Sequence, residues 1–277
     1  MKMKLFSYSQ LDTYIHHLSG FTKLICFLLL TTTVMLSYDI RVIIGVLILS
    51  LICFRIAKIE FKQVKLMFIY VSIFLITNFI LTFIFAPTRG VNIYGSQTVL
   101  ISLFGNFDIT LEQIFFQVTK LLKYLSVIPL GMIFFFTTNP SAFASSLNKA
   151  KVNYKACTVL SLTLRYFPDV TRDYHTISLA NQARGIEMSS KAKLKDRLKH
   201  IIDILIPLIF TTLDRIDIIS CAMELRGYGK LKKRSWYSFR PLDKKDYFAI
   251  TICSLVFIGS ILITMYINKS IYYNPFI

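Results

Sequence analysis

Two pairs of aspartates are spaced so that a helix would bring their carboxylates onto one face. Asp169 and Asp173 are four residues apart, and Asp214 and Asp217 are three apart. Such pairs could hold Mg2+ for an intramembrane transferase that acts on lipid phosphates. Each pair is interleaved with arginine, however, and a solvated face of ion pairs explains the same spacing. The ion-pair interpretation is favoured, and a Mg2+-dependent transferase that uses Asp169 and Asp173 is the alternative.

Two arginine-glycine pairs offer a different chemistry, the docking of a partner protein. Long amphipathic segments end in Arg184-Gly185 and in Arg226-Gly227, with the arginines 42 residues apart. Glycine often ends a helix and arginine suits the negative end of a helix dipole, so one copy would need no further explanation. Two copies in one basic segment favour function, because a guanidinium on a rigid helix can form a bidentate pair with a partner's carboxylate. The adjacent glycine lets the partner's backbone approach closely.

Motifs for other chemistry are missing from the sequence. Residues 227–230, Gly-Tyr-Gly-Lys, lack the spacing of a phosphate-binding P-loop, so the chain is not expected to hydrolyse ATP by itself. The expected spans carry no central Asp or Glu, which disfavours ion-coupled secondary transport. The five cysteines show no CxxC spacing, and neither a zinc site nor a disulfide framework is implied. We therefore expect a protein that is not an enzyme.

The composition is typical of a membrane protein. Of the 277 residues, 55% are hydrophobic, and the mean hydropathy is +0.58. The net charge is +17, and residues 139–246 hold 20 basic against 10 acidic residues. Positive charge beside apolar spans indicates retention in the cytoplasm and contact with anionic lipid headgroups, which disfavours nucleic-acid binding. A membrane scaffold whose basic segment binds only anionic lipid is a further hypothesis.

Five apolar stretches predict an all-α integral membrane protein with about five transmembrane helices and an N-terminus inside the cell. The predicted spans are residues 21–38, 40–54, 66–85, 111–138 and 247–267. A loop with a short apolar run is expected between the third and fourth spans. The first half of the fourth span has one polar stripe, formed by Gln113, Gln117, Lys120 and Tyr124. We expect Lys120 and Lys123 to face protein or to snorkel toward water.

The chain is expected to divide into three parts. Residues 1–138 form an N-terminal membrane domain with four spans, residues 139–246 a cytoplasmic or interfacial coupling domain, and residues 247–277 a final span with an external tail. In the middle part, Pro168 is expected to begin a helix that ends at Arg184, and a second helix is expected to run from the basic residues 191–199 to Arg226. Residues 201–212 are too short for a span and are expected to lie on the membrane surface or against another subunit.

The two helix ends resemble the signatures of a known family, the transmembrane coupling subunits (T components) of energy-coupling factor (ECF) importers, which include cobalt-type and biotin-type relatives. Ala-Arg-Gly at 183–185 matches the first signature, and Leu-Arg-Gly at 225–227 matches the second except that Leu225 replaces the usual small residue. Residues 164–168 resemble the segment before the first signature helix. His17-Leu18 and Thr22-Lys23-Leu24 resemble the family's N-terminal motif, from which Gly20 and Phe21 depart.

The resemblance implies an importer of vitamins or metal ions with four parts: two cytoplasmic ABC-type ATPases, this coupling subunit, and a small membrane S component that captures the substrate. This chain would bind no cofactor, since ATP and Mg2+ would belong to the ATPases. The ATPases would dock on Ala183, Arg184, Gly185, Leu225, Arg226 and Gly227. The S component would contact Val159, Leu160, Leu164, Ile201, Ile204 and Leu208. The complex would lie in the plasma membrane of a prokaryote, with this subunit crossing it several times.

Overall fold

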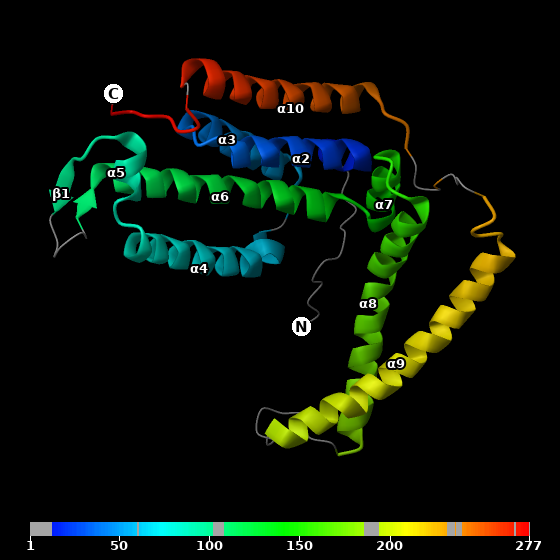
Figure 1. Cartoon of the computed structure of the whole chain (residues 1–277). Coiled ribbons are helices and arrows are strands. Elements are labelled where there is room, and N and C mark those ends of the chain that lie inside the picture. The colour runs from blue at the N-terminus through cyan, green and yellow to red at the C-terminus, as the bar shows by residue number, and fades with distance from the viewer. Residues whose placement is uncertain are drawn as a thin grey trace. The chain divides into compact units, whose positions relative to one another are not determined.

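The computed structural model describes residues 13–59, 61–101, 108–185, 194–231, 236, 240–268 and 270–276. Over this part of the chain the structure is almost wholly α-helical, which confirms the predicted all-α fold (Figure 1). The helices pack into two compact units. Unit 1 combines Met1–Asn139 with Arg240–Ile277, and unit 2 consists of Pro140–Phe239. Unit 2 is therefore inserted into unit 1 between two segments that are far apart in the sequence.

Unit 1 contains most of the helices and a small sheet. Its elements are α1 (Tyr14–His17), α2 (Gly20–Leu36), α3 (Ile40–Ile56), α4 (Phe61–Phe85), α5 (Arg89–Tyr94), β1 (Val99–Ile101), β2 (Ile109–Thr110), α6 (Leu111–Thr137), α10 (Lys244–Leu262) and the π-helix η1 (Ile263–Ile267). Polar side chains determine where the longer helices begin. At the start of α2, α3, α6 and α10, one side chain accepts a hydrogen bond from a backbone N–H of the first turn. These capping residues are, in the same order, Ser19, Asp39, Thr110 and Asp243.

Three helices in the described residues are long and apolar enough to cross a membrane. They are Met67–Phe85 within α4, Leu111–Thr137, and Lys244–Ile267, which joins α10 to η1. Helices α2 and α3 have 17 residues each. At 1.5 Å per residue each is about 26 Å long, at the lower limit for a hydrocarbon core of about 30 Å. The three long spans correspond to predicted spans, and the count of five stays a prediction.

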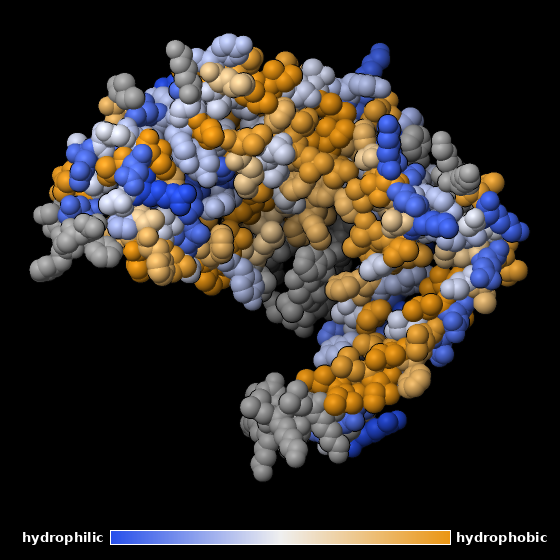
Figure 2. All heavy atoms as spheres, viewed as in Figure 1, coloured by the Kyte–Doolittle hydropathy of each residue, from blue (hydrophilic) through white to orange (hydrophobic). Residues whose placement is uncertain are grey.

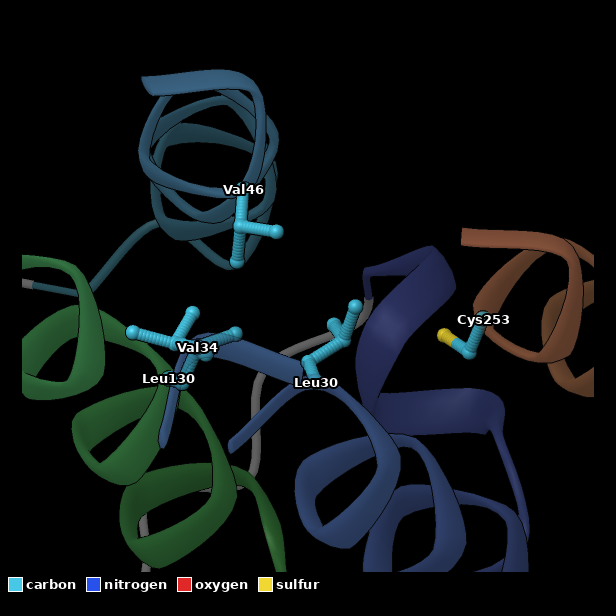
Figure 3. Packing of buried hydrophobic residues seen from close by; sticks show 5 residues of the cluster. All are labelled: Leu30, Val34, Val46, Leu130 and Cys253. Carbon is cyan, nitrogen blue, oxygen red and sulfur yellow. The ribbon is translucent and has the colours of Figure 1, made fainter. Parts of the chain in front are cut away.

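The apolar core of unit 1 lies where α2, α3, α6 and α10 meet. Leu30 and Val34 of α2 pack with Val46 of α3, Leu130 of α6 and Cys253 of α10 (Figure 3). Helix α4 stands apart from this core, and its apolar window is not buried by the rest of the described chain. A helix that is apolar on all sides and uncovered by protein has the surface of one surrounded by hydrocarbon.

The polar stripe predicted on the first half of α6 faces the inside of unit 1. The side chain of Gln113 is only 1% exposed. The Lys120 ammonium donates a hydrogen bond to Thr82 Oγ1 of α4 at 2.9 Å. The Lys123 ammonium donates to the carbonyl oxygen of Met35, at the end of α2, at 2.7 Å. Both lysines therefore face protein, which was one of the two predicted arrangements.

The connection between α4 and α6 contains more regular structure than the predicted loop. It forms α5 and a two-stranded antiparallel sheet, in which Val99 of β1 lies opposite Thr110 of β2. Gly95 ends α5 with a left-handed backbone (φ 73°). The N–H of Gly90 donates to Gln113 Oε1 at 2.7 Å, which holds α5 on α6. These elements satisfy backbone polar groups close to the membrane, where unpaired groups would be costly.

Unit 2 consists of α7 (Pro140–Lys149), α8 (Tyr154–Ala183) and α9 (Leu194–Leu225). The prediction that Pro168 begins a helix was wrong, because Pro168 lies inside α8, which starts at Tyr154. The residues before Pro168 already form a helix, which is capped by Asn153 and packs on α7. A proline within this helix removes only one of its backbone hydrogen bonds.

Burial raises the pKa of the Cys157 thiol, so this group stays neutral in the core of the unit. Residues 191–193, predicted to begin the next helix, lie outside the described residues.

Candidate functional site at two arginine-glycine helix ends

The first arginine lies at the C-terminal end of α8. The backbone N–H of Arg184 still donates to the Ala180 carbonyl oxygen at 3.2 Å, as the last residue of a helix does. Gly185 then adopts φ 84°, and its N–H donates to the Gln182 carbonyl oxygen at 3.0 Å. Residues with a Cβ are strained in this left-handed conformation, so glycine suits the position. The chain thus turns sharply away directly after Arg184, whose side chain is exposed.

The second arginine ends α9 in the same way. Gly227 adopts φ 68°, and its N–H donates to the Glu224 carbonyl oxygen at 2.8 Å. The N–H of Tyr228 donates to the Met223 carbonyl oxygen at 2.9 Å. These two bonds define a Schellman motif, a common and rigid way to end a helix. Arg226 holds the same position relative to the glycine as the arginine of α8, and its side chain is exposed as well.

The residues that precede the two arginines differ in character. Ala183 and Leu225 are both exposed, and Leu225 has 89% of its surface accessible. A single exposed leucine is common on proteins. Here it stands beside an exposed guanidinium at a helix end, so one helix end offers a charge alone and the other offers a charge with an apolar group.

Helices α8 and α9 pack against each other in opposite directions, and they cross in Figure 1. Among the contacts between the described residues, Asp173 Oδ2 lies 2.6 Å from Arg215 Nη2, and Asn181 Nδ2 lies 3.5 Å from the Asp203 carbonyl oxygen. The ring of Tyr154, at the start of α8, lies 5.9 Å from the ring of Tyr228, just after α9. Residues later in α8 therefore meet residues earlier in α9. This order of contacts shows that the helices are antiparallel.

The antiparallel arrangement separates the two arginines. Arg184 follows three residues after Asn181, which contacts Asp203 near the beginning of α9. Arg226 lies at the other end of α9, 23 residues beyond Asp203. At 1.5 Å per helical residue, this places the backbones of the two arginines about 35 Å apart along the helix. They cannot both enter one groove, but each can serve a separate one.

The six apolar residues predicted to contact an S component do not share one exposed surface. Val159 is 63% exposed and Ile201 is 44% exposed. Leu160, Leu164 and Leu208 are half-buried. Ile204, expected on the surface, is 1% exposed and lies in the interior of unit 2. The physical reason is that the helix face bearing Ile204 is the one covered by α8, since its neighbour Asp203 contacts the end of that helix.

A larger exposed apolar face runs along α9, and sequence reasoning identified it only in part. Its members are each about half exposed or more: Ile202, Ile206, Ile209, Phe210, Leu213 and Ile216. Figure 2 shows apolar side chains gathered along this helix. The spacing of three and four residues predicts an apolar face on this helix. It does not show which side of the helix a neighbouring helix covers.

Two of the four aspartates considered for Mg2+ form ion pairs with arginines. Asp169 lies 3.5 Å from Arg172, and Asp173 lies 2.6 Å from Arg215. Asp214 and Asp217 are exposed on α9. In the described part of the chain, no group of three or more His, Cys, Asp or Glu side chains is placed to hold a metal ion. The observed contacts are those of the ion-pair interpretation, and Asp173 has the structural role of tying α8 to α9.

We expect Asp173→Asn to weaken the packing of α8 on α9 by about 1 to 2 kcal/mol, because its ion pair is short and only about one-third exposed. Thermal melting of the purified protein, with Arg215→Met and the double variant to complete a mutant cycle, would measure this coupling. Asp169→Asn is the control, since its pair with Arg172 is longer and more exposed and should contribute less than about 0.5 kcal/mol. Equal losses from both substitutions would contradict the assignment.

The fold and the site together define a class of protein. It is an α-helical membrane protein into which a pair of long antiparallel helices is inserted, each ending in an exposed arginine followed by a left-handed glycine. Residues 12–237 match the model of the CbiQ family, described as cobalt transport protein. This match covers most of the chain, and the chain therefore belongs to that family.

Individual relatives agree along nearly the whole length. The energy-coupling factor transporter transmembrane protein EcfT of Macrococcus caseolyticus is 23% identical over 272 residues, which cover 92% of this chain and 97% of the relative. EcfT of Staphylococcus aureus is 25% identical, covering 91% and 94%. EcfT of Streptococcus equi subsp. equi is 27% identical, covering 91% and 93%. These matches confirm the predicted identity of the chain as a T component of an energy-coupling factor transporter.

Proposed function

We propose that this chain is the non-catalytic subunit that couples two cytoplasmic ABC-type ATPases to a membrane S component, which captures a vitamin or a metal ion. The observation that supports this most directly is the pair of arginine-glycine ends. Both arginines are exposed at the last position of a long helix, and both are held there by a left-handed glycine. Two helix ends that share an exposed arginine and a left-handed glycine suit two similar partners.

The chemistry of each end suits an acidic groove. A guanidinium presents planar donors that match a carboxylate in a bidentate manner, and its pairing strengthens when a groove excludes water. Because the arginines lie about 35 Å apart along α9, each would meet a different ATPase subunit. ATP and Mg2+ would be bound by those subunits, and this chain would only receive and transmit their motion.

The exposed apolar face of α9 suits a partner of another kind. Isoleucine, leucine and phenylalanine side chains that are about half exposed would be stabilised by a membrane-embedded surface, as an S component offers. The basic composition of residues 139–246 favours the cytoplasmic side of a prokaryotic plasma membrane. With the four predicted spans before these residues, the N-terminus would lie inside as well. In this arrangement unit 2 lies between the ATPases and the substrate-capturing protein.

Purification of the chain from its native membranes tests the proposal. An affinity tag would follow Ile277 after a flexible linker, because the Phe276 ring packs on Tyr94 and Phe115 and should be left undisturbed. In mild detergent, we expect two ABC-type ATPase subunits and at least one small hydrophobic membrane protein to co-purify in stoichiometric amounts. A chain that elutes alone, while other membrane complexes stay intact, would overturn the proposal.

A further inference from the structure

The basic turn, residues 148–155, joins α7 to α8 and holds one lysine in a strained conformation. The N–H of Lys151 donates to the Asn148 carbonyl oxygen at 3.0 Å. The N–H of Val152 donates to the Leu147 carbonyl oxygen at 3.1 Å. These are the bonds of a Schellman motif, as at the end of α9. The left-handed position that Gly227 occupies after α9 is held here by Lys151, with φ 69°. A residue with a Cβ is strained in this conformation, and strained residues often mark functional sites.

The basic turn carries exposed positive charge. Lys149, Lys151 and Lys155 are all exposed, and residues 139–168 contain no Asp or Glu. The ion pairs found among the described residues involve neither Lys151 nor Lys155. A lysine ammonium is a compact charge on a flexible stem, and it binds phosphate groups as a point charge. The turn therefore offers cations to an anionic partner.

An aliphatic side chain and an indole accompany these charges. Val152, directly after the strained lysine, is 41% exposed. Trp236, the only tryptophan of the chain, is partly exposed, and its Nε1–H donates to Asn148 Oδ1 at 3.2 Å. The Asn148 Nδ2 group donates to the carbonyl oxygen of Val152 at 3.0 Å. One amide thus ties the indole to the turn. Tryptophan is enriched where membranes meet water, because its ring is apolar and its N–H is polar.

The covalent chain keeps the basic turn near a membrane. Helix α7 begins at Pro140, three residues after the end of α6, which is long and apolar enough to cross a membrane. The ten residues of α7 make it only about 15 Å long, so the turn stays tethered near the span whatever direction α7 takes. Anionic lipids of the cytoplasmic leaflet attract basic segments beside membrane spans. An acidic protein would also attract lysines, but an exposed valine and an indole beside them favour a lipid.

We propose that the basic turn, together with Trp236, binds an anionic phospholipid of the cytoplasmic leaflet. Lys151 and Lys155 hold the lipid phosphate, while Val152 and the indole lie at the boundary between headgroups and acyl chains. This inference goes beyond the coupling function and does not rest on it. ATPase docking belongs to the arginine ends of α8 and α9, and the lipid would bind the chain whether or not ATPases are present.

Fluorescence of Trp236 would test the proposal, because no other tryptophan of the chain contributes to the emission. The full chain would be reconstituted in phosphatidylcholine liposomes that contain increasing fractions of brominated phosphatidylglycerol or of brominated phosphatidylcholine. Bromine on an acyl chain quenches an indole only at short range, so quenching reports a lipid beside Trp236. Each lysine near an anionic surface contributes about fivefold in affinity. We therefore expect brominated phosphatidylglycerol to quench at a mole fraction about tenfold below that of brominated phosphatidylcholine.

Three variants make the test specific. Lys151→Gln combined with Lys155→Gln should remove the preference, so that both brominated lipids quench at nearly equal mole fractions. Arg165→Gln combined with Arg172→Gln is the matched control, because it removes the same charge from exposed positions of α8 outside the basic turn. This control should keep the preference. Lys151→Gly should lower the preference about fivefold. It relieves the strained backbone, so it should not lower the melting temperature, and a folding defect would not explain its effect.

The outcomes are distinct. Equal quenching by the two lipids in the wild-type chain would overturn the inference, and so would an equal loss of preference in the Arg165 and Arg172 control. A double variant of Lys151 and Lys155 that keeps the full preference would overturn it as well. If that variant also lost co-purifying ATPases, the basic turn would belong to a protein interface instead. The coupling function stands or falls separately, by the purification experiment described for it.

Discussion

Replacement of both Arg184 and Arg226 by glutamate is expected to abolish assembly of the chain with ABC-type ATPases. Each substitution removes a guanidinium and would introduce repulsion toward the acidic groove proposed for the ATPase. Loss of one partner of a desolvated charged pair costs about 2 kcal/mol or more, which is at least about 30-fold in affinity. Because the two ends lie about 35 Å apart, their effects should be nearly additive. Co-purification of ATPases with the tagged double variant would measure the loss.

The control for this prediction reverses two arginines elsewhere on α8. Arg165 and Arg172 are exposed along the helix, so their replacement by glutamate changes the net charge by the same amount without touching either helix end. Assembly should survive this change. If the control also abolishes assembly, total charge governs the interaction, as expected for a scaffold that binds anionic lipid. Full assembly of the Arg184 and Arg226 double variant would rule out docking by these ends.

A second large effect is expected from Gly90→Ala, which should destabilise unit 1 by about 3 kcal/mol. A Cβ at this position would lie 2.6 Å from the backbone N and Cα of Gln113 and from the carbonyl oxygen of Glu112. These are backbone atoms of α6, so no side-chain rotation can relieve the overlap. The substitution would also disturb the hydrogen bond from the Gly90 N–H to Gln113. Thermal melting in detergent should show a decrease of about 5 °C or more.

Gly131 provides the comparison for this measurement. It lies within α6, and a Cβ added there would meet no atom within 4 Å. Alanine is the better helix former, so Gly131→Ala should leave stability unchanged or raise it by up to about 1 kcal/mol. If the two alanine variants melt at the same temperature, the close approach of α5 to α6 does not contribute to stability.

Much of the membrane fold could be predicted because its signals are local. The long spans at α4, α6 and α10 are continuous apolar runs, and their length alone identifies them. The start of α7 at Pro140 follows an equally local rule for proline at the first helical position. The same rule misplaced the start of α8 at Pro168, because a capped and packed segment upstream outweighed the cost of an internal proline.

Some features of the candidate site could likewise be predicted from the sequence, and others could not. The two arginine-glycine ends were predictable because a helix stop depends on a few adjacent residues. Sequence could not show that Asp173 meets Arg215 or that Ile204 is buried while Ile206 is exposed. Those outcomes depend on the direction and crossing of α8 and α9, which no residue specifies alone. The hydrogen bond from the Ser19 N–H to Asp246 Oδ1 could not be predicted for the same reason, since its partners are more than 200 positions apart.

The unlike ends of α8 and α9 have a consequence for symmetry. Two identical subunits most often pair about a twofold axis. A single chain whose two arginines are preceded by alanine and by a leucine that is 89% exposed has no such axis. Two identical ATPases bound to it would be placed in different surroundings, and one of them would cover Leu225. In the proposed complex, this chain would therefore distinguish the two ATPase subunits, and two different ATPase sequences could each adapt to one end.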